Sequence, residues 1–409
     1  MNFPTALSWF KRTPSASPAP KSSRPERAQL RVGIPKALSV WSTHQFWVGF
    51  LHALGVDERN IVFSSDTSEE QFRTYGKGRG TVEACYAVKC VSGHYGELIF
   101  GQRKKIHVLL HPMFLTLPSF LRGHVAETFA CTRDMAAAEN IKAGFLREKD
   151  VFAENGIAYC NPLVSLGEPQ LVAKQLYESM QQALALDWDE VQPAVDAGFR
   201  ALRRFNDSMR TASRKTLEWC AQNSRACVMV LARPYHMDPG VGHEIESELQ
   251  SKGYPVIWAQ YFPLDDDLLQ WLFGEEIRRG EIKSPLDIAD VWVSSYSSST
   301  NEIVWGAKVA ARVPWVTCVL RLSSYECGMD QPTFTPVQKI VEATGTLYFK
   351  FGDLDATKPT GSVKIRTETI EHYVEKNAQD IIRRKLSYLP SECPMLAKTV
   401  ERNLGLTAA

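Results

Sequence analysis

The chain has 409 residues, of which 44% are hydrophobic and 23% are charged, a composition typical of a globular protein with two or three domains. Its formal net charge of +1 argues against binding to nucleic acid or to an anionic membrane surface. No apolar run reaches about 18 residues, so we predict no membrane span.

The first 29 residues begin with a short apolar stretch and continue with proline, serine, lysine and arginine without periodicity. A secretory signal has its basic residues before a longer apolar core, and here that order is reversed. We therefore predict a disordered tail over residues 1–29, with an incorrectly assigned start codon as the alternative.

Strand and helix patterns alternate between residues 30 and 165, which indicates a first lobe with a parallel sheet covered by helices on both faces. The predicted strands are 30–34, 60–64, 106–110 and 155–163. The predicted helices are 37–54, capped by Gly55, a helix that starts near 65–70, and 88–100. The predicted loops are a glycine-rich one at 76–80 and an apolar one at 112–125.

The rest of the chain repeats this organisation after a helical connector, predicted at 166–224, whose apolar residues keep helical spacing from about 171 to 222. The second lobe, at 225–352, has predicted strands at 226–231, 255–259, 289–294, 315–320 and 346–351. Its predicted helices lie within 240–253 and at 301–311, and a C-terminal helical segment at 353–409 includes a helix at 365–387. The expected fold is α/β, with two lobes that each contain a mostly parallel sheet flanked by helices.

The nine cysteines form no evenly spaced framework, which favours reduced thiols in a cytoplasmic protein over disulfides. Three of them, Cys85, Cys131 and Cys327, lie in predicted loops, and Cys327 follows a strand at the edge where parallel sheets form their sites. Three thiolates from separate loops can hold a 4Fe–4S cluster, and Gly328 lets the backbone approach such a bulky partner. We predict that these cysteines bind one iron–sulfur cluster in a cleft between the lobes.

Spacing alone does not establish this cluster, because the sequence has no CxxCxxC run and a free cysteine commonly packs as a small hydrophobe. Of the other six cysteines, Cys90 is a reserve ligand and Cys393 is incidental. Core packing is the better interpretation for the remaining four, which are Cys160, Cys220, Cys227 and Cys318.

Three stretches carry a family resemblance: VEACYAVKCVSGHYGEL at 82–98, ARPYHMDPGVGHEI at 232–245 and SSYECGMDQPTF at 323–334. They resemble the cysteine-containing portion of the activator proteins of 2-hydroxyacyl-CoA dehydratases, of the long CoA activase type. More remotely, they resemble the cluster-binding subunits of the dehydratases. The resemblance covers about residues 30–385. The chain departs from the family pattern at Ala87 and Met329, where the family has proline, and at Gln331, where it has serine.

This resemblance implies two α/β lobes, an oxygen-sensitive 4Fe–4S cluster on Cys85, Cys131 and Cys327, and a role in low-potential electron transfer. In the family, an ATPase module of actin-like fold drives the electron, and the long form carries that module upstream. The present sequence has no glycine-rich phosphate loop, since neither 76–81 nor 240–242 has the required spacing. We therefore expect a separate ATPase activator subunit or a dehydratase-like protein as partner, and an acyl-CoA as a candidate ligand.

Polar residues around the first motif have two interpretations each. His94 is either a donor or ligand to the cluster or a hydrogen-bonded helix histidine. Lys89 either balances the charge of the cluster or faces solvent. In the third motif, Glu326 and Asp330 either lower the potential of the cluster or cap local backbone.

The second motif forms a polar loop beyond a predicted strand end, with Arg233, Tyr235, His236, Asp238 and His243. Such a loop binds an acyl-CoA phosphate, positions a partner or, in the interpretation we favour, holds a strand-to-helix turn. A metal site of the two histidines lacks a third ligand. The serine-rich stretch 295–301 either cradles a ligand or caps a helix.

The function expected from these patterns is a redox component of the acyl-CoA dehydratase activation system. The first alternative is an enzyme of the dehydratase or reductase type that acts on a CoA thioester at an open iron site. The second is a non-redox scaffold whose cluster only staples the two lobes. The third is a bilobal protein that binds a small molecule without any metal.

Overall fold

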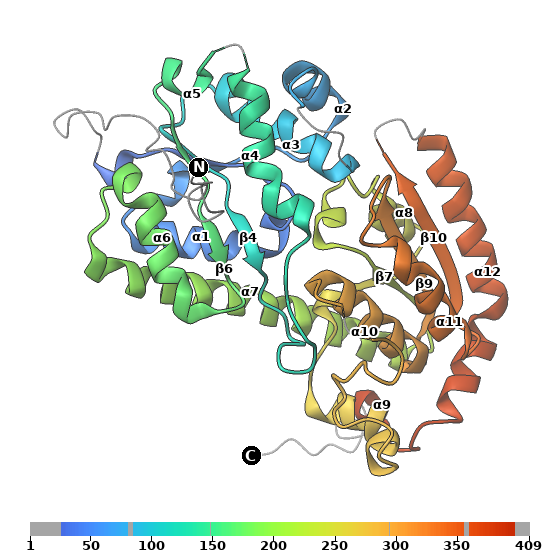
Figure 1. The fold of residues 1–409 in the computed structure, drawn as a ribbon. Coiled ribbons are helices and arrows are strands. Elements are labelled where there is room, and N and C mark those ends of the chain that lie inside the picture. Colours follow the sequence, from blue (N-terminus) through green and yellow to red (C-terminus); the bar gives the residue numbers. More distant parts are fainter. Residues whose placement is uncertain (1–25, 81–84, 148, 294, 356–359, 397–409) are drawn as a thin grey trace, which may run out of the picture.

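The computed structural model describes residues 26–80, 85–147, 149–293, 295–355 and 360–396. Two α/β lobes lie beside each other, and the long helix α7 (Trp188–Gln222) extends from one to the other (Figure 1). This arrangement confirms the predicted fold class. The predicted domain boundaries stay a prediction.

The first lobe is built on a four-stranded parallel sheet in the order β2-β1-β3-β5. Its strands are β1 (Val32–Ile34), β2 (Ile61–Phe63), β3 (Val108–Leu110) and β5 (Ala158–Cys160). Its helices are α1 (Val40–Ala53), α2 (Glu69–Gln71), α3 (Tyr86–Gly96), α4 (Thr132–Leu146) and α5 (Val151–Glu154). Side chains of β3 alternate between two cores, with Val108 and Leu110 packing on the α1 side and Leu109 on the α3 and α4 side. Both faces of this sheet are therefore covered.

The second lobe has a four-stranded parallel sheet in the order β10-β9-β7-β8. Its strands are β7 (Cys227–Leu231), β8 (Val256–Trp258), β9 (Val316–Ser324) and β10 (Leu347–Leu354). Its helices are α8 (Ile245–Ser251), α9 (Asp266–Arg278), α10 (Ser298–Arg312), α11 (Phe334–Glu342) and α12 (Thr360–Leu386). Met229 of β7 packs into the core formed with α9, α10 and α11, whereas Val228 packs toward α8 and α12. The central strands β7 and β9 are fully buried, as expected of a parallel sheet with two covered faces.

The connector is two helices, α6 (Pro169–Leu184) and α7, and not the single helix predicted over 171–222. Ala185 adopts a left-handed conformation with φ of 51°, which ends α6. Asp187 and Glu190 then form a reciprocal capping box that starts α7. The left-handed Ala185 and the capping box therefore separate two helices, although the spacing of the apolar residues continues across the break.

Helix α7 contributes to the cores of both lobes. Val191 and Leu202 pack in the core of the first lobe, and Leu217 and Cys220 pack in the core of the second. In its first third, Gly198 lies so close to α1 that an added Cβ would come within 2.8 Å of Phe46. This close packing fixes α7 against the first lobe.

Three other predictions differ from the structure. The strand predicted at 289–294 is wrong for the described residues 289–293, because turn hydrogen bonds, such as Trp292 N to Ile288 O, use the backbone locally. The apolar loop predicted at 112–125 contains the strand β4 (Met113–Thr116), which pairs with β6 (Leu163–Ser165). Helices α4, α5, α9 and α11 were not predicted.

The tail predicted to be disordered over residues 1–29 lies outside the described residues up to residue 25. The described part, from Glu26, is ordered and includes a 3-10 turn at Arg27–Gln29. The Arg27 guanidinium lies 2.6 Å from the Glu190 carboxylate and donates to the carbonyls of Leu184 and Ala185. Arg27 therefore binds both sides of the junction between α6 and α7.

None of the helices in the described ranges is both long enough and apolar enough to span a lipid bilayer.

Candidate functional site

The candidate site begins where β7 and β9 end. These strands are adjacent and parallel, so their carboxyl ends open onto the same edge of the sheet. Arg233 follows β7, and Cys327 follows β9. The loop after β7 reaches across to the first lobe, because Tyr235 and Val241 pack in the same core as Cys85.

A fully buried group of charges supports this edge. Asp330 accepts hydrogen bonds from Arg233 Nε at 3.2 Å, Arg233 Nη2 at 3.0 Å and Ser323 Oγ at 2.7 Å. Arg321 Nη2 lies 3.0 Å from the same carboxylate in an ion pair. One carboxylate is thus shared by two guanidiniums, which leaves an excess of positive charge beside Cys327.

The ionisation of these groups follows from their surroundings. Burial alone would raise the pKa of Asp330, but Arg233 and Arg321 hold it well below its usual range. Burial opposes the charge of Arg233, yet Asp330 and then the thiol of Cys327 hold the pKa of its guanidinium above the usual value. The salt bridge therefore stays ionised throughout the neutral range.

Cys85 and Cys131 occupy equivalent positions in the first lobe, because each is the residue that precedes a helix. Cys85 precedes α3 and Cys131 precedes α4. The backbone N–H of Tyr86 donates to the carbonyl of Tyr325 at 3.4 Å, which joins the segment of Cys85 to that of Cys327. Two of the predicted cysteines therefore lie on directly linked segments of different lobes.

The three thiols also interact electrostatically. Burial raises the pKa of Cys85, the nearby Cys131 raises it further, and Arg233 lowers it. Burial raises the pKa of Cys327 to about 11, against the attraction of Arg233. The Arg233 guanidinium is also influenced by Cys131. A single buried cation is thus within electrostatic range of all three thiols.

The arrangement of these cysteines differs in its fit to a single metal ion and to an iron–sulfur cluster. No three His, Cys, Asp or Glu side chains in the described ranges lie close enough together to hold one metal ion. A cluster is larger than an ion, and its thiolate ligands bind separate iron atoms. All three thiols are free, and a Cβ added at Gly328 would enter open space beside Cys327. The donor set is compatible with a cluster, and its assignment stays a prediction.

A hydrogen-bonded chain, which we call the interlobe latch, joins the lobes close to this site. Asp238 of the second lobe accepts from Thr67 of the first, through the backbone N–H at 3.1 Å and through Oγ1 at 2.7 Å. Thr67 Oγ1 lies 2.9 Å from His94 Nε2, and His94 Nδ1 lies 2.8 Å from Ser64 Oγ. Because Thr67 donates to Asp238, it accepts from His94, which fixes the neutral tautomer with its proton on Nε2.

The latch decides the role of His94. Both ring nitrogens are used by Ser64 and Thr67, and burial lowers the pKa of the ring to about 4. His94 is therefore a hydrogen-bonded helix histidine, and its alternative role as a cluster ligand is wrong.

We expect His94→Gln to make stability less dependent on pH in the acid range. Below about pH 6.5 the unfolded chain takes up a proton on His94, whereas the folded state does so only near its pKa of about 4. As the pH decreases through that window, the free energy of unfolding of the wild type therefore decreases. His94 contributes at most about 1.4 kcal/mol per pH unit to this decrease. Urea unfolding at several pH values should show that the free energy of unfolding of His94→Gln changes less per pH unit than that of the wild type, by up to that amount.

The control for this prediction is the exposed histidine His52. His52→Gln should leave the slope unchanged. An identical slope in wild type and His94→Gln would contradict the prediction.

The other polar residues singled out from the sequence have structural partners. Lys89 Nζ lies 4.0 Å from Glu326 in a half-exposed ion pair across the lobes. His236 contacts the Arg233 carbonyl and Ser324 Oγ, each at 3.2 Å. The loop after β7 is therefore held by hydrogen bonds, as favoured from the sequence.

The stretch 295–301 forms the start of α10, and the side chain of its N-cap residue Ser297 makes no capping hydrogen bond. Asn301 Oδ1 accepts from Ser295 N at 2.9 Å, and α10 begins directly after Ser297. Cys90, the reserve ligand, is buried and hydrogen-bonded to Tyr86.

Sequence reasoning missed two residues of the site. Arg321 lies within the apolar strand β9, where a charge is unusual, and that signal could have identified it. Thr67 has no distinguishing pattern, because its role depends on the distant Asp238.

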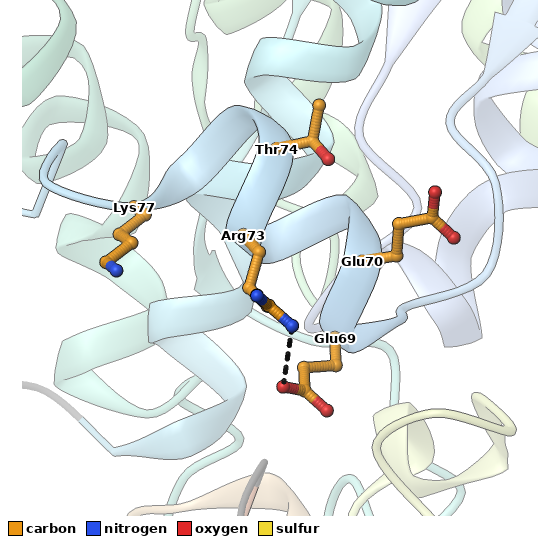
Figure 2. Close-up of a pocket in the computed structure, with 5 residues that line it drawn as sticks. All are labelled: Glu69, Glu70, Arg73, Thr74 and Lys77. Atoms are coloured by element: carbon orange, nitrogen blue, oxygen red, sulfur yellow. Dashed lines mark ion pairs between the residues drawn. The ribbon is translucent and has the colours of Figure 1, made fainter.

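The pocket shown in Figure 2 is a weaker candidate for a functional site. It is lined by Glu69, Glu70, Arg73, Thr74 and Lys77, which are all exposed. Figure 2 shows one ion pair, Glu69 with Arg73 at 3.8 Å, whereas Glu70, Thr74 and Lys77 point in different directions. These side chains do not converge on a common point.

Comparison with known families gives one match. Residues 31–262 match a family model described as a CoA enzyme activase uncharacterised domain. The match covers 232 residues, more than half of the chain, and includes Cys85, Cys131 and the loop after β7. Cys327 lies outside it. No curated protein matches the chain. The match confirms the resemblance to the CoA activase type.

Proposed function

Because this chain belongs to the family of the CoA enzyme activase domain, we propose that it is an iron–sulfur component of a CoA-related activation system. In this proposal Cys85, Cys131 and Cys327 bind one 4Fe–4S cluster between the lobes. Such a cluster accepts and donates single electrons, at a potential set by charge, hydrogen bonding and burial.

The observation that carries the proposal is the shared electrostatic environment of three free thiols around Arg233. Metal binding requires thiolates, yet burial raises the pKa of Cys85 and Cys327. The positive charge of Arg233 opposes this effect at Cys85 and Cys327, because it favours the deprotonated form of both thiols. The low exposure of Cys85 and Cys327, about 5% each, would limit access of water.

We further propose that the electron is exchanged with a separate protein. The family of the CoA enzyme activase domain favours an ATPase activator subunit or a dehydratase-like protein as this partner. The ion pair of Lys89 with Glu326 and the exposed Tyr325 lie beside the segments of Cys85 and Cys327. This surface is our candidate for the contact with the partner.

The test is iron and sulfide analysis of protein purified without oxygen. We expect about four iron and four sulfide per chain in wild type, and a loss of most of both in Cys85→Ser, Cys131→Ser and Cys327→Ser. Cys393→Ser is the matched control, because this half-buried cysteine is predicted to be incidental, and it should keep its iron. Iron-free wild-type protein, or full iron content in all three variants, would overturn the proposal.

Electron paramagnetic resonance then separates electron transfer from the alternatives. Reversible reduction without unfolding supports a redox role, whereas a cluster that cannot be reduced in the folded protein supports a scaffold. A change of the signal on addition of an acyl-CoA would instead favour an enzyme with an open iron site.

A further inference from the structure

Two side chains at the surface, Tyr296 and Met329, meet beside the three-cysteine site. The Tyr296 hydroxyl donates to Met329 Sδ at 3.7 Å, and a thioether sulfur is a weak acceptor. Tyr296 is 49% exposed and Met329 is partly exposed, whereas Asp330, the residue after Met329, is fully buried. The contact therefore lies outside the buried charges that support the site.

Met329 belongs to the segment of Cys327. The backbone N–H of Asp330 donates to the carbonyl of Cys327 at 3.2 Å, so residues 327–330 form a tight turn that includes Met329. The chain departs from the family pattern at this position, where the family has proline. The thioether beside Cys327 is therefore a feature of this sequence.

Tyr296 is tied to the segment of Cys131. The backbone N–H of Phe129 donates to the carbonyl of Tyr296 at 2.8 Å, and the backbone N–H of Ser298 donates to the carbonyl of Phe129 at 2.9 Å. Only Ala130 separates Phe129 from Cys131. The contact of Tyr296 with Met329 therefore connects the segment of Cys131 to that of Cys327.

Backbone and core contacts join the three segments on the other two sides. The backbone hydrogen bond from Tyr86 to Tyr325 joins the segments of Cys85 and Cys327. Cys85 also packs in the same core as Ala137 of α4, the helix that begins after Cys131. The segments thus form a ring. On the side between Cys131 and Cys327, the contact of Tyr296 with Met329 can open by rotation of surface side chains alone, which is fast.

The buried Arg233 shows that both segments converge on the thiols. Its Nη2 lies 3.4 Å from Thr300 Oγ1 in the first turn of α10, close in sequence to Tyr296. The same nitrogen lies 3.0 Å from Asp330 Oδ1, the neighbour of Met329. Because this guanidinium is within electrostatic range of all three thiols, Tyr296 and Met329 lie on segments that border the centre of the site.

From this arrangement we propose that Tyr296 and Met329 form a cover that controls how fast small solutes, such as dioxygen and thiol reagents, reach the sulfurs of the site. Cys131 is affected most, because it is the least buried of the three cysteines and its segment is the one that Tyr296 holds. The cover is a property of the folded chain. Its value in protecting a cluster from oxygen rests on the proposed function.

The test is the rate at which iodoacetamide alkylates Cys131 in the full chain, which is first freed of any iron with a chelator and kept reduced. The cysteine sulfur displaces iodide, and mass spectrometry of peptides follows each cysteine separately. We expect Tyr296→Ala and Met329→Ala each to speed the reaction at Cys131 by about threefold to tenfold, the effect of losing one weak contact of a thioether with an aromatic side chain.

Two further variants test whether the residues act together. The double alanine variant should react about as fast as the faster single variant, because either substitution alone breaks the same contact. Tyr296→Phe keeps the ring and loses only the hydroxyl, so it should show a smaller rise of about twofold. This mild substitution of a half-exposed residue keeps the test valid if an alanine variant does not fold.

The chain offers two controls. Tyr373 on α12 is 47% exposed, much like Tyr296, and Tyr373→Ala should leave the rate at Cys131 unchanged. The half-buried Cys393 is the internal reference, and its own alkylation rate should be the same in all variants.

The proposal is overturned if the folded variants alkylate Cys131 no faster than wild type does, if Cys393 accelerates equally, or if the effects of the two alanine substitutions multiply in the double variant. Because the readout is alkylation of iron-free protein, these outcomes leave the cluster proposal unaffected. Conversely, failure to find iron in the wild type would leave the cover in place.

Discussion

Replacing Asp330 with alanine should lower the free energy of unfolding by about 3–5 kcal/mol, the largest loss we expect from a single substitution. The change removes the carboxylate shared by Arg233 and Arg321, which are both at most 3% exposed. Two guanidiniums would remain buried without a countercharge, and neither can reach water without disrupting β7 or β9. Urea unfolding followed by circular dichroism measures the loss.

The exposed ion pair of Asp353 with Arg366, at 3.4 Å, is the matched control, and Asp353→Ala should change stability by less than about 1 kcal/mol. The pH dependence provides a second check. Because the pKa of Asp330 is depressed in the folded state, its contribution is present above about pH 4 and is lost as the pH falls further. The variant should lack that part of the acid dependence. Equal losses in the two alanine variants would contradict the argument.

Removing Asp238 from the interlobe latch should cause the second largest loss of stability. Asp238→Ala removes the acceptor of three donors, which are Thr67 N, Thr67 Oγ1 and Gly240 N. Each buried donor left without a partner costs about 1 kcal/mol or more, so we expect a total loss of about 3 kcal/mol. We also expect faster amide exchange in residues 64–67, because their contact with the second lobe is broken.

The neighbouring carboxylate of Asp66 is the matched control. It is exposed and pairs with Lys36 at 2.6 Å, within the first lobe. Asp66→Ala should lower stability by less than about 1 kcal/mol and leave amide exchange at the interface unchanged. If Asp238→Ala leaves both stability and exchange as in wild type, the lobes are held together by other contacts.

The general fold was predictable because its strands are short apolar runs bounded by turn residues. The runs that became β1, β3, β7 and β9 are buried on both faces, and their residues carry that signal themselves. The run at 289–294 is also largely apolar, but in its described part, 289–293, local turns use the backbone groups. Helix α4 was missed because its alanine-rich sequence has little apolar periodicity, and its burial depends on α3 and the sheet.

The candidate site was predictable only in part. The loop settings of Cys85, Cys131 and Cys327 were visible in the sequence, and so was the polar character of the loop after β7. The pairings were not visible, because Asp330 with Arg233 and Asp238 with Thr67 join residues 97 and 171 positions apart. Local patterns carry no information about such partners.

The helix α7 limits how the molecule can be divided or moved. Its two halves are embedded in different cores, so neither lobe could be expressed alone without exposing an apolar stripe that the other normally hides. For the same reason, a swinging motion at this junction would require the helix itself to bend. Together with the hydrogen bonds of Asp238 and Tyr325 to the first lobe, the helix therefore resists relative displacement of the lobes.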